Sequence, residues 1–289
     1  NLKEQASPDI SEDKFIINIV RTNVKNMQSK EVQVNISNID SSNIDISKKS
    51  PVELIKKDNY DEIWISFCPI WILNKYLTTL INCNKHKKYK IRRIITCSSS
   101  SKITKKYSWN KYDKSLIEKI SFAENNLIKI SKKNNIHLSI IRPTMIFGNS
   151  GEFKDNNINK ITSISKISPI IFLPKESGER QPIHISQLAK IIDNEISLEK
   201  YQKRLNLINV GGDETLTYEN LVRNILKKKK INSILFVIKT ELFFFIISPI
   251  LLINPRLYSE IMRICSNLSG FTESHILLKN NKEKFIDFI

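Results

Sequence analysis

Apolar runs of strand length alternate with helix-like segments through the first half of the chain, and this alternation strongly restricts its fold. The runs are nearly continuous, as expected of parallel strands buried on both faces of a sheet. They cover residues 15–21, 61–67, 91–97 and 137–141, with a weaker strand at 31–36. We expect 91–97 and 137–141 to be adjacent parallel strands, because a helix separates them. The pattern predicts an α/β fold with a parallel sheet.

The helical segments are recognised by their apolar periodicity. Residues at alternating spacings of four and three form one apolar face along 113–131: Leu116, Ile120, Ala123, Leu127 and Ile130. Other helices are predicted at 51–57, 70–82, 155–167, 186–196 and 217–228, with Ser186 as a helix N-cap. Extended segments are predicted at 169–174, 183–185 and 206–210, the last followed by a turn at Gly211-Gly212. We therefore expect two domains, 1–150 and 151–289, with strands 183–185 and 206–210 returning to the sheet.

The net charge of +17 comes from basic residues spread along the chain and interleaved with acids. We interpret it as compositional, which argues against a nucleic-acid partner. Two basic runs, 86–93 and 227–230, are local exceptions. The four cysteines form no Cys-x-x-Cys pair and no Cys/His cluster, so we expect no metal site, and reduced core cysteines at 68 and 97 favour a cytoplasmic protein. The first residue is Asn, which leaves open a longer reading frame or a truncated gene.

Three motifs occur in a characteristic order: RPTMIFG at 142–148, RQPIHISQLA at 180–189 and LNLINVGG at 205–212. With the strands before them they resemble the nucleotide-sugar epimerase/dehydratase branch of the extended or atypical short-chain dehydrogenase/reductase family. The resemblance covers roughly residues 15–223. It implies a Rossmann-type doubly wound sheet, whose first strand is missing here, and a smaller, mostly helical C-terminal lobe. It also implies NAD or NADP as cofactor and a nucleotide-sugar or other small molecule as substrate.

The resemblance assigns roles to residues at the strand ends. The residues at cofactor-binding positions are Arg21, Asn38, Phe67, Cys68, Pro69, Ser98, Pro143 and Thr144. The catalytic hydroxyl falls at Ser99 or Ser100, and the substrate-binding positions are Arg142, Arg180 and His184. Arg21 would suit a 2′-phosphate and favour NADP, or it is an ordinary strand-end arginine. His184 lies between two isoleucines, so a half-buried structural role is the alternative to substrate binding.

Two features depart from the family pattern. The family's catalytic Tyr, with Lys four residues later, corresponds to Leu116 and Ile120, which cannot transfer a proton. A literal Tyr-x-x-x-Lys match, Tyr107 and Lys111, lies nine residues too early. In addition, none of the six glycines precedes Gly148, so the glycine-rich loop that brings backbone amides to a pyrophosphate is absent from the sequence as given. We therefore predict weak NAD(P) binding, or none.

The segment 235–253 is very apolar, but Lys239, Glu241 and Pro249 interrupt it, so a membrane span is not expected. It is either a core helix of the C-terminal lobe or a helix lying on a membrane surface beside the lysines at 227–230.

Several functions remain open. The resemblance implies an epimerase/dehydratase-like protein, which is active with an upstream glycine loop or is degenerate. Alternatively it is a non-catalytic dinucleotide-binding or assembly protein resembling the accessory subunit of respiratory complex I. A third alternative is a peripheral protein at the inner face of a membrane.

Overall fold

The computed structural model describes residues 15–22, 29–36, 61–83, 91–106, 111–149, 155–197, 204–253 and 257–289. The chain divides into two compact units. Unit 1 comprises residues 1–97, 122–140 and 201–206, and unit 2 comprises residues 98–121, 141–200 and 207–289. This division does not follow the predicted boundary at residue 150, because the chain passes from one unit to the other several times. The helix predicted at 51–57 lies outside the described residues.

Within the described ranges, the main sheet has seven strands in the order β13-β10-β5-β4-β3-β1-β2. Their bounds are β1 Phe15–Thr22, β2 Ser29–Ile36, β3 Asp61–Ser66, β4 Ile91–Cys97, β5 His137–Pro143, β10 Leu205–Gly211 and β13 Thr272–Glu273. Five of them, β3, β4, β5, β10 and β13, form the parallel centre of a Rossmann-type sheet. The prediction that residues 91–97 and 137–141 are neighbouring strands is confirmed, and β10 does return to the sheet as expected.

The prediction that residues 15–21 form a parallel strand is wrong. Strand β1 pairs antiparallel with both β2 and β3, and its register places Arg21 opposite Glu62. An unbroken apolar run suits a buried strand of either direction, so the sequence did not distinguish them. As a consequence, Arg21 lies beside the amino end of β3, whereas parallel strands offer ligands their carboxyl ends.

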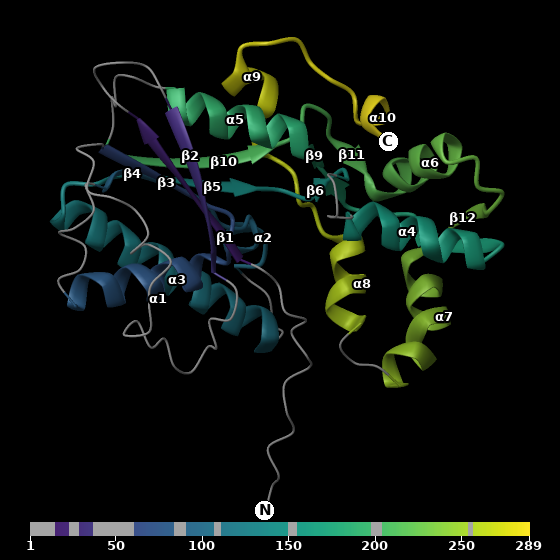
Figure 1. Ribbon diagram of the computed structural model, residues 1–289. Coiled ribbons are helices and arrows are strands. Elements are labelled where there is room, and N and C mark those ends of the chain that lie inside the picture. The colour runs from purple at the N-terminus through teal and green to yellow at the C-terminus, as the bar shows by residue number, and fades with distance from the viewer. Residues whose placement is uncertain are drawn as a thin grey trace, which may run out of the picture. The chain divides into compact units, whose positions relative to one another are not determined.

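In unit 1, α1 (Ile70–Asn82) and the C-terminal part of α3 (Lys111–Lys133) pack together. The Asn126 side-chain amide donates to the Asn74 carbonyl oxygen at 2.8 Å, and the two helices lie side by side in Figure 1. Apolar side chains at helical spacing are buried, including Leu73 and Leu77 of α1 and Leu127 of α3. Each such leucine stabilises the fold by about 2 kcal/mol. The predicted bounds of α1 agree with the structure, and α3 extends the predicted 113–131 at both ends.

The described part of unit 2 contains three two-stranded sheets and most of the helices that the structure describes. The paired strands are β6 Ile146–Phe147 with β9 Ile183–His184, β8 Glu179–Arg180 with β11 Leu216–Thr217, and β7 Ile170–Pro174 with β12 Ile234–Ile238. The helices are α2 Ser101–Thr104, α4 Asn156–Ile167, α5 Ile185–Ser197, α6 Tyr218–Lys228, α7 Thr240–Ile253, α8 Leu257–Cys265, α9 Ser274–Leu278 and α10 Phe285–Phe288. The expectation that 183–185 returns to the main sheet is therefore wrong, since β9 pairs with β6.

Helix α6 organises the core of unit 2. Its hydroxyl cap is Thr217, whose Oγ1 accepts a hydrogen bond from the Asn220 amide at 3.1 Å. One side of α6 buries Leu221 and Ile225 in a cluster with Phe147 and other apolar side chains. A second cluster forms where its other apolar residues, Val222 and Leu226, meet Leu173 of β7. Helix α6, which follows the third sequence motif, is thus packed through two groups of apolar side chains.

Helix α7 is a peripheral apolar element. It buries Phe243, while Phe245 is 76% exposed and Leu242 and Ile246 are also exposed. Pro249 lies inside the helix. Among the described helices, none combines the length and apolar character needed to cross a membrane.

Candidate functional site

Two of the predicted site segments lie together at the carboxyl ends of neighbouring strands. The serines 98–100 follow β4, and Pro143 ends β5. The Ser98 amide donates to the Ile141 carbonyl at 2.7 Å, and the Ser100 amide donates to the Pro143 carbonyl at 3.3 Å. Ligands of doubly wound sheets bind at such strand ends. This edge is therefore the candidate site.

Ser100 carries the hydroxyl best placed to meet a ligand. The Ser99 hydroxyl oxygen accepts a bond from the Ser101 amide at 3.1 Å, which commits Ser99 to the start of α2. The Ser100 carbonyl accepts the Thr104 amide at 3.0 Å. The Ser100 hydroxyl itself, on a half-buried side chain, makes no side-chain cap bond to α2 and no hydrogen bond to any other described residue. Of the two predicted catalytic serines, Ser100 is the one that remains available.

Arg142 and Thr144, predicted as a substrate and a cofactor contact, make contacts within the protein. Arg142 is buried and donates through Nη1 to the Asn209 side-chain oxygen at 3.1 Å. The Thr144 amide donates to the Val210 carbonyl at 2.9 Å, and its hydroxyl donates to the Gln181 carbonyl. Both residues thereby fasten the end of β5 to β10, and Thr144 also fastens it to Gln181.

Arg180 does not offer its guanidinium to a substrate, contrary to the sequence prediction. It is 5% exposed and donates to the main-chain carbonyls of Ser266, at 2.6 Å, and Arg263. Its guanidinium also lies 5.2 Å from the centre of the Tyr218 ring. Burial lowers the pKa of Arg180 to about 10. The side chain binds carbonyls at and just after the C-terminal end of α8, where intrahelical partners run out, and the Arg263 carbonyl also accepts the Ser266 amide at 3.2 Å.

His184 caps helix α5, which supports the structural alternative for this residue. Its Nδ1 accepts the Ser186 amide at 3.3 Å, and its own amide donates to the Gln187 side-chain oxygen at 3.0 Å. This reciprocal arrangement is that of a capping box. The prediction that Ser186 is the N-cap is therefore wrong by two residues. The imidazole stacks on Phe288 at 4.3 Å, and burial lowers the pKa of His184, which favours the neutral form that accepts at Nδ1.

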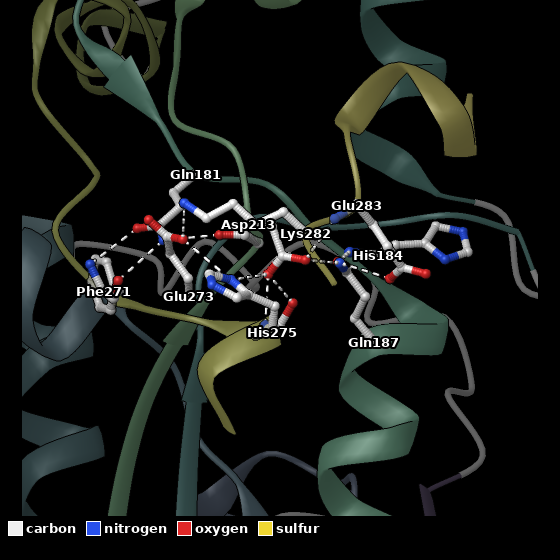
Figure 2. A network of polar contacts seen from close by, with 11 residues as sticks. Gln181, His184, Gln187, Asp213, Phe271, Glu273, His275, Lys282 and Glu283 are labelled. Carbon is white, nitrogen blue, oxygen red and sulfur yellow. Dashed lines mark hydrogen bonds and ion pairs between the residues drawn. The ribbon is translucent and has the colours of Figure 1, made fainter. Parts of the chain in front are cut away.

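Asp213 is a buried carboxylate at the centre of a polar network that sequence reasoning missed (Figure 2). One oxygen, Oδ1, accepts the Ser274 hydroxyl and the His275 amide at 2.8 Å. The other, Oδ2, accepts the Glu283 amide at 3.0 Å and the Gln187 side-chain amide at 3.2 Å. Burial by itself would raise the pKa of Asp213, but these donors outweigh it and lower the pKa. The carboxylate holds residues 274–283 against α5.

Gln181 fastens the same C-terminal segment at a second point (Figure 2). Its amide nitrogen donates to the carbonyls of Gly212 and Phe271 at 2.9 and 3.0 Å, and its oxygen accepts the Phe271 amide at 3.0 Å. Gly211 permits this approach, because a Cβ there would lie 2.4 Å from Cδ of Gln181, and a Cβ at Gly212 would lie 1.9 Å from the Pro182 carbonyl oxygen. The glycines interpreted as a turn are therefore needed for close packing. The only hint of this role in the sequence is the position of Asp213 directly after the Gly211-Gly212 pair.

The predicted cofactor wall in unit 1 is present in part. Phe67, which follows β3, is half exposed and offers a ring face. Cys68 is 2% exposed and lies 3.0 Å from the Ser66 hydroxyl, so it is a core residue and its side chain does not face a ligand. Pro69 precedes α1 as its cap residue. Asn38 lies outside the described residues.

Helix α3 carries no proton-transfer pair at the positions that the resemblance assigns. Ile120 is 2% exposed and Leu116 is half-buried, as expected of the apolar face. Lys111 is exposed at the start of the helix, and its proposed partner Tyr107 lies outside the described residues. An ion pair not foreseen from the sequence joins the Lys105 ammonium to Asp113 at 2.6 Å, with both side chains mostly buried. It ties the end of α2 to the first turn of α3.

The described residues fit only part of a dinucleotide. The half-buried Ser100 hydroxyl beside Pro143 could contact a nicotinamide or a sugar. No glycine occurs between residues 15 and 147, so no described backbone segment there lets amides approach a pyrophosphate without an intervening Cβ. Within the described part of the chain, no group of three His, Cys, Asp or Glu residues could hold a metal ion.

Comparison with known proteins shows similarity in structure. No protein-family model and no curated protein sequence matches the chain. UDP-glucuronic acid 4-epimerase from Bacillus cereus, solved with UDP-glucuronic acid and NAD, superposes with a TM-score of 0.50 at 15% identity, covering 76% of this chain and 64% of its own. UDP-N-acetylglucosamine 4-epimerase from Bacillus cereus gives a TM-score of 0.48 at 15% identity, covering 74% and 68%. The chain thus spans about two thirds of the length of these enzymes. The superposition on UDP-glucuronic acid 4-epimerase shows that it shares the Rossmann-type fold of that enzyme.

Proposed function

We propose that the chain binds a nucleotide-sugar at the carboxyl edge of its parallel sheet, beside Ser100, and that it is an epimerase/dehydratase-like protein without the family's Tyr/Lys proton transfer. The observation that carries the proposal is the Ser100 hydroxyl. It is half-buried, makes no hydrogen bond to a described residue and is held next to Pro143 by a main-chain bond of 3.3 Å. A hydroxyl in this place can hydrogen-bond a sugar hydroxyl or carbonyl.

The side chains of α3 support the loss of proton transfer. A Tyr and a Lys one turn apart would act as acid or base because the ammonium lowers the phenol pKa. Here the corresponding side chains are Leu116 and Ile120, which are apolar, and Ile120 is in the core. A lysine placed there would have to bury its charge at a cost of several kcal/mol. At these positions the chain therefore has no side chain that could transfer the proton as the family's Tyr and Lys do.

The cofactor is the weakest part of the family pattern in this chain. NAD supplies hydride transfer where it binds. The residues that would hold its nicotinamide end here are Ser98 and Ser100, with Pro143 beside them. Without glycines to bring amides to the pyrophosphate, we expect the chain as given to bind NAD and NADP only weakly, at dissociation constants of about 1 mM or more.

Calorimetry tests the proposal directly. The chain is titrated with UDP-glucuronic acid, UDP-N-acetylglucosamine, NAD and NADP, and each nucleotide-sugar is also incubated with the chain and checked for an epimerised product. We expect saturable binding of a nucleotide-sugar and no epimer. The variant Ser100→Ala should weaken binding by roughly five- to tenfold, the effect of one hydrogen bond. The matched control is Ser115→Ala, an exposed hydroxyl on α3, which should bind like the parent.

Two results would contradict the proposal: no binding of either nucleotide-sugar, or equal affinity of the parent and Ser100→Ala. The second candidate function, a non-catalytic dinucleotide-binding or assembly protein, is favoured by the same apolar α3 positions. Tight NAD or NADP binding in the absence of any nucleotide-sugar binding would select it, and would mean that another backbone segment replaces the glycine loop.

A further inference from the structure

The two-stranded sheet of β7 and β12 carries an apolar face that the protein leaves uncovered. The strands are parallel and in register, with Ile170 beside Ile234 and Phe172 beside Phe236. These four side chains, which we call the ribbon face, are between 39% and 58% exposed. The phenylalanine rings lie 6.0 Å apart. A half-buried strand normally turns polar residues outward, so four exposed apolar side chains on one face need an explanation.

The opposite face of the same two strands forms part of the core. Leu173 is buried against α6, and Ile171 and Leu235 pack against the same cluster. The alternation of side chains along each strand then directs the ribbon face away from α6. Its exposure therefore follows from the pairing register and from the core contacts, because a shift of one residue would expose Leu173 and Leu235 instead.

Two more exposed apolar side chains lie at the end of helix α4, which precedes β7 in the chain. Ile167, the last residue of α4, is 85% exposed, and Ile164 one turn earlier is 52% exposed. The chain then enters β7 after Ser168 and Pro169. The Ser233 hydroxyl donates to the Ser168 carbonyl at 2.7 Å, which fastens the end of α4 to the start of β12. Ile167 and the ribbon face are thus held close together in one unit.

Basic residues lie at both ends of this surface. Four consecutive exposed lysines, 227–230, end α6 and precede β12 by three residues. Lys228 donates to the Ile286 carbonyl at 3.1 Å, whereas the ammonium groups of Lys227, Lys229 and Lys230 have no partner among the described residues. The helix dipole of α6 accounts for lysines in its last turn, but not for two more beyond it.

Acidic and basic groups both occur at the other end of the ribbon. Lys175 and Lys239 are exposed there, as are Glu176 and Glu241, so the net charge at this end is balanced. The positive charge of the surface is therefore concentrated at the end where Lys166 of α4 and the run 227–230 lie.

We propose that the ribbon face, together with Ile167 and the lysines 227–230, docks on an anionic lipid surface. Exposed isoleucine and phenylalanine side chains gain free energy at the boundary of headgroups and acyl chains, and adjacent lysines gain from anionic headgroups. A second copy of the chain fits less well, because two copies meeting through this face would bring two lysine runs together on molecules of net charge +17. A nucleic acid would satisfy the lysines but leave the apolar face in water.

Vesicle flotation of the full chain tests the apolar part. Phosphatidylcholine vesicles with and without phosphatidylglycerol are compared, and we expect flotation with the anionic vesicles alone. The double variant Ile167→Gln/Phe236→Thr should lower the partition coefficient about tenfold or more, since each side chain loses about 1 kcal/mol or more of burial. The matched control is Ile103→Gln/Phe122→Gln, which changes exposed apolar side chains elsewhere and should bind like the parent.

A second pair of variants tests the charge. The first carries K227Q, K229Q and K230Q. The control carries K114Q, K132Q and K133Q, which removes the same charge from exposed positions on α3. We expect the first to weaken binding by about fivefold per lysine at low ionic strength, and the control to have little effect.

Four results would overturn the proposal. Flotation fails with both vesicle types, or is equal on neutral and anionic vesicles. A control variant weakens binding as much as its test variant. Finally, sedimentation shows a concentration-dependent dimer of the parent that Ile167→Gln/Phe236→Thr abolishes, which would assign the ribbon face to a second copy of the chain. Ile167 is 85% exposed at a helix end, so Ile167→Gln alone keeps the test valid if the double variant fails to fold.

Discussion

Replacement of Asp213 by Asn should detach the C-terminal segment of the protein from α5. The carboxylate accepts four hydrogen bonds, two on each oxygen, from donors that include the main-chain amides of His275 and Glu283. An asparagine keeps one acceptor oxygen and places an NH₂ group where the other oxygen stood. With the NH₂ group at the Oδ2 position, both the Glu283 amide and the Gln187 side-chain amide face a donor. With the NH₂ group at the Oδ1 position, only the His275 amide does, because the Ser274 hydroxyl can rotate to accept.

The cost follows from the less costly orientation, in which one of the four bonds is lost. Hydrogen bonds to a charged group contribute about 1.5–3 kcal/mol each, so Asp213→Asn should destabilise the protein by about 1.5–3 kcal/mol. That is a large part of the total stability of a typical domain, about 5–15 kcal/mol. The loss should first appear as local opening of residues 271–289, which contain two of the carboxylate's main-chain donors.

Urea unfolding followed by circular dichroism measures the global effect, and hydrogen exchange with mass spectrometry measures the local one. In the variant, the amides of His275 and Glu283 should exchange faster than in the parent. The pH dependence provides an independent check. Because the folded pKa of Asp213 lies below its ordinary value of 3.8, its contribution is complete above that pH and is lost as the pH falls through the folded value. The difference between parent and variant should therefore close in acid.

Glu118→Gln, which neutralises an exposed carboxylate on α3, is the matched control and should change stability by less than about 0.5 kcal/mol. The reasoning is refuted if Asp213→Asn costs less than about 1 kcal/mol, or if the amides of residues 271–289 keep the protection they have in the parent.

Three further predictions rest on single side chains. The pKa of His184 is lowered, so the stability of the protein should fall as the pH drops below about 6.5. The variant His184→Asn retains a capping oxygen and should remove this pH dependence from the melting temperature. An unchanged pH dependence would argue against the cap. Arg180→Lys should cost about 2–3 kcal/mol in urea unfolding, because Arg180 reaches the two carbonyls from two separate guanidinium nitrogens and a lysine has a single nitrogen. An unaffected midpoint would contradict this role. Cys83 is exposed and should react quickly with a thiol reagent, whereas burial raises the pKa of Cys97 to about 12 and should delay its reaction until the protein unfolds. Mass spectrometry of the labelled peptides measures both reaction rates, and equal rates would refute this prediction.

Most of the local structure could be predicted from the chain, since its signals are short-range. The bounds of α1 follow from the spacing of apolar residues between Pro69 and Cys83, and the long helix α3 follows from five side chains on one face. The order of strand and helix likewise indicated the parallel centre of the sheet. The candidate site was predicted in part for the same reason, because a serine run directly after a strand is visible in the sequence.

The roles of Arg180 and His184 could not be assigned from the motif that contains them. Arg180 bonds to carbonyls more than 80 residues away in the sequence, at 263 and 266, and no local pattern indicates which carbonyls lack partners. His184 caps a helix whose first residue, Ile185, lies two positions earlier than an N-cap at Ser186 would place it. In both cases a polar side chain was expected to face a ligand, and tertiary contacts use it inside the protein.

The sequence by itself determined most of the strands and helices up to residue 228, which helix lacks the Tyr and Lys of the family, and that no glycine precedes Gly148 in the sequence as given. These properties depend on residue type and spacing along the chain. Only the tertiary structure decided that β1 runs antiparallel, that Asp213 fastens the last residues of the chain, and that the ribbon face is left uncovered. All three features depend on residues that are distant in sequence: the neighbouring strand, the hydrogen-bond partner and the element that does or does not cover a face. Composition and periodicity do not indicate which residues these are.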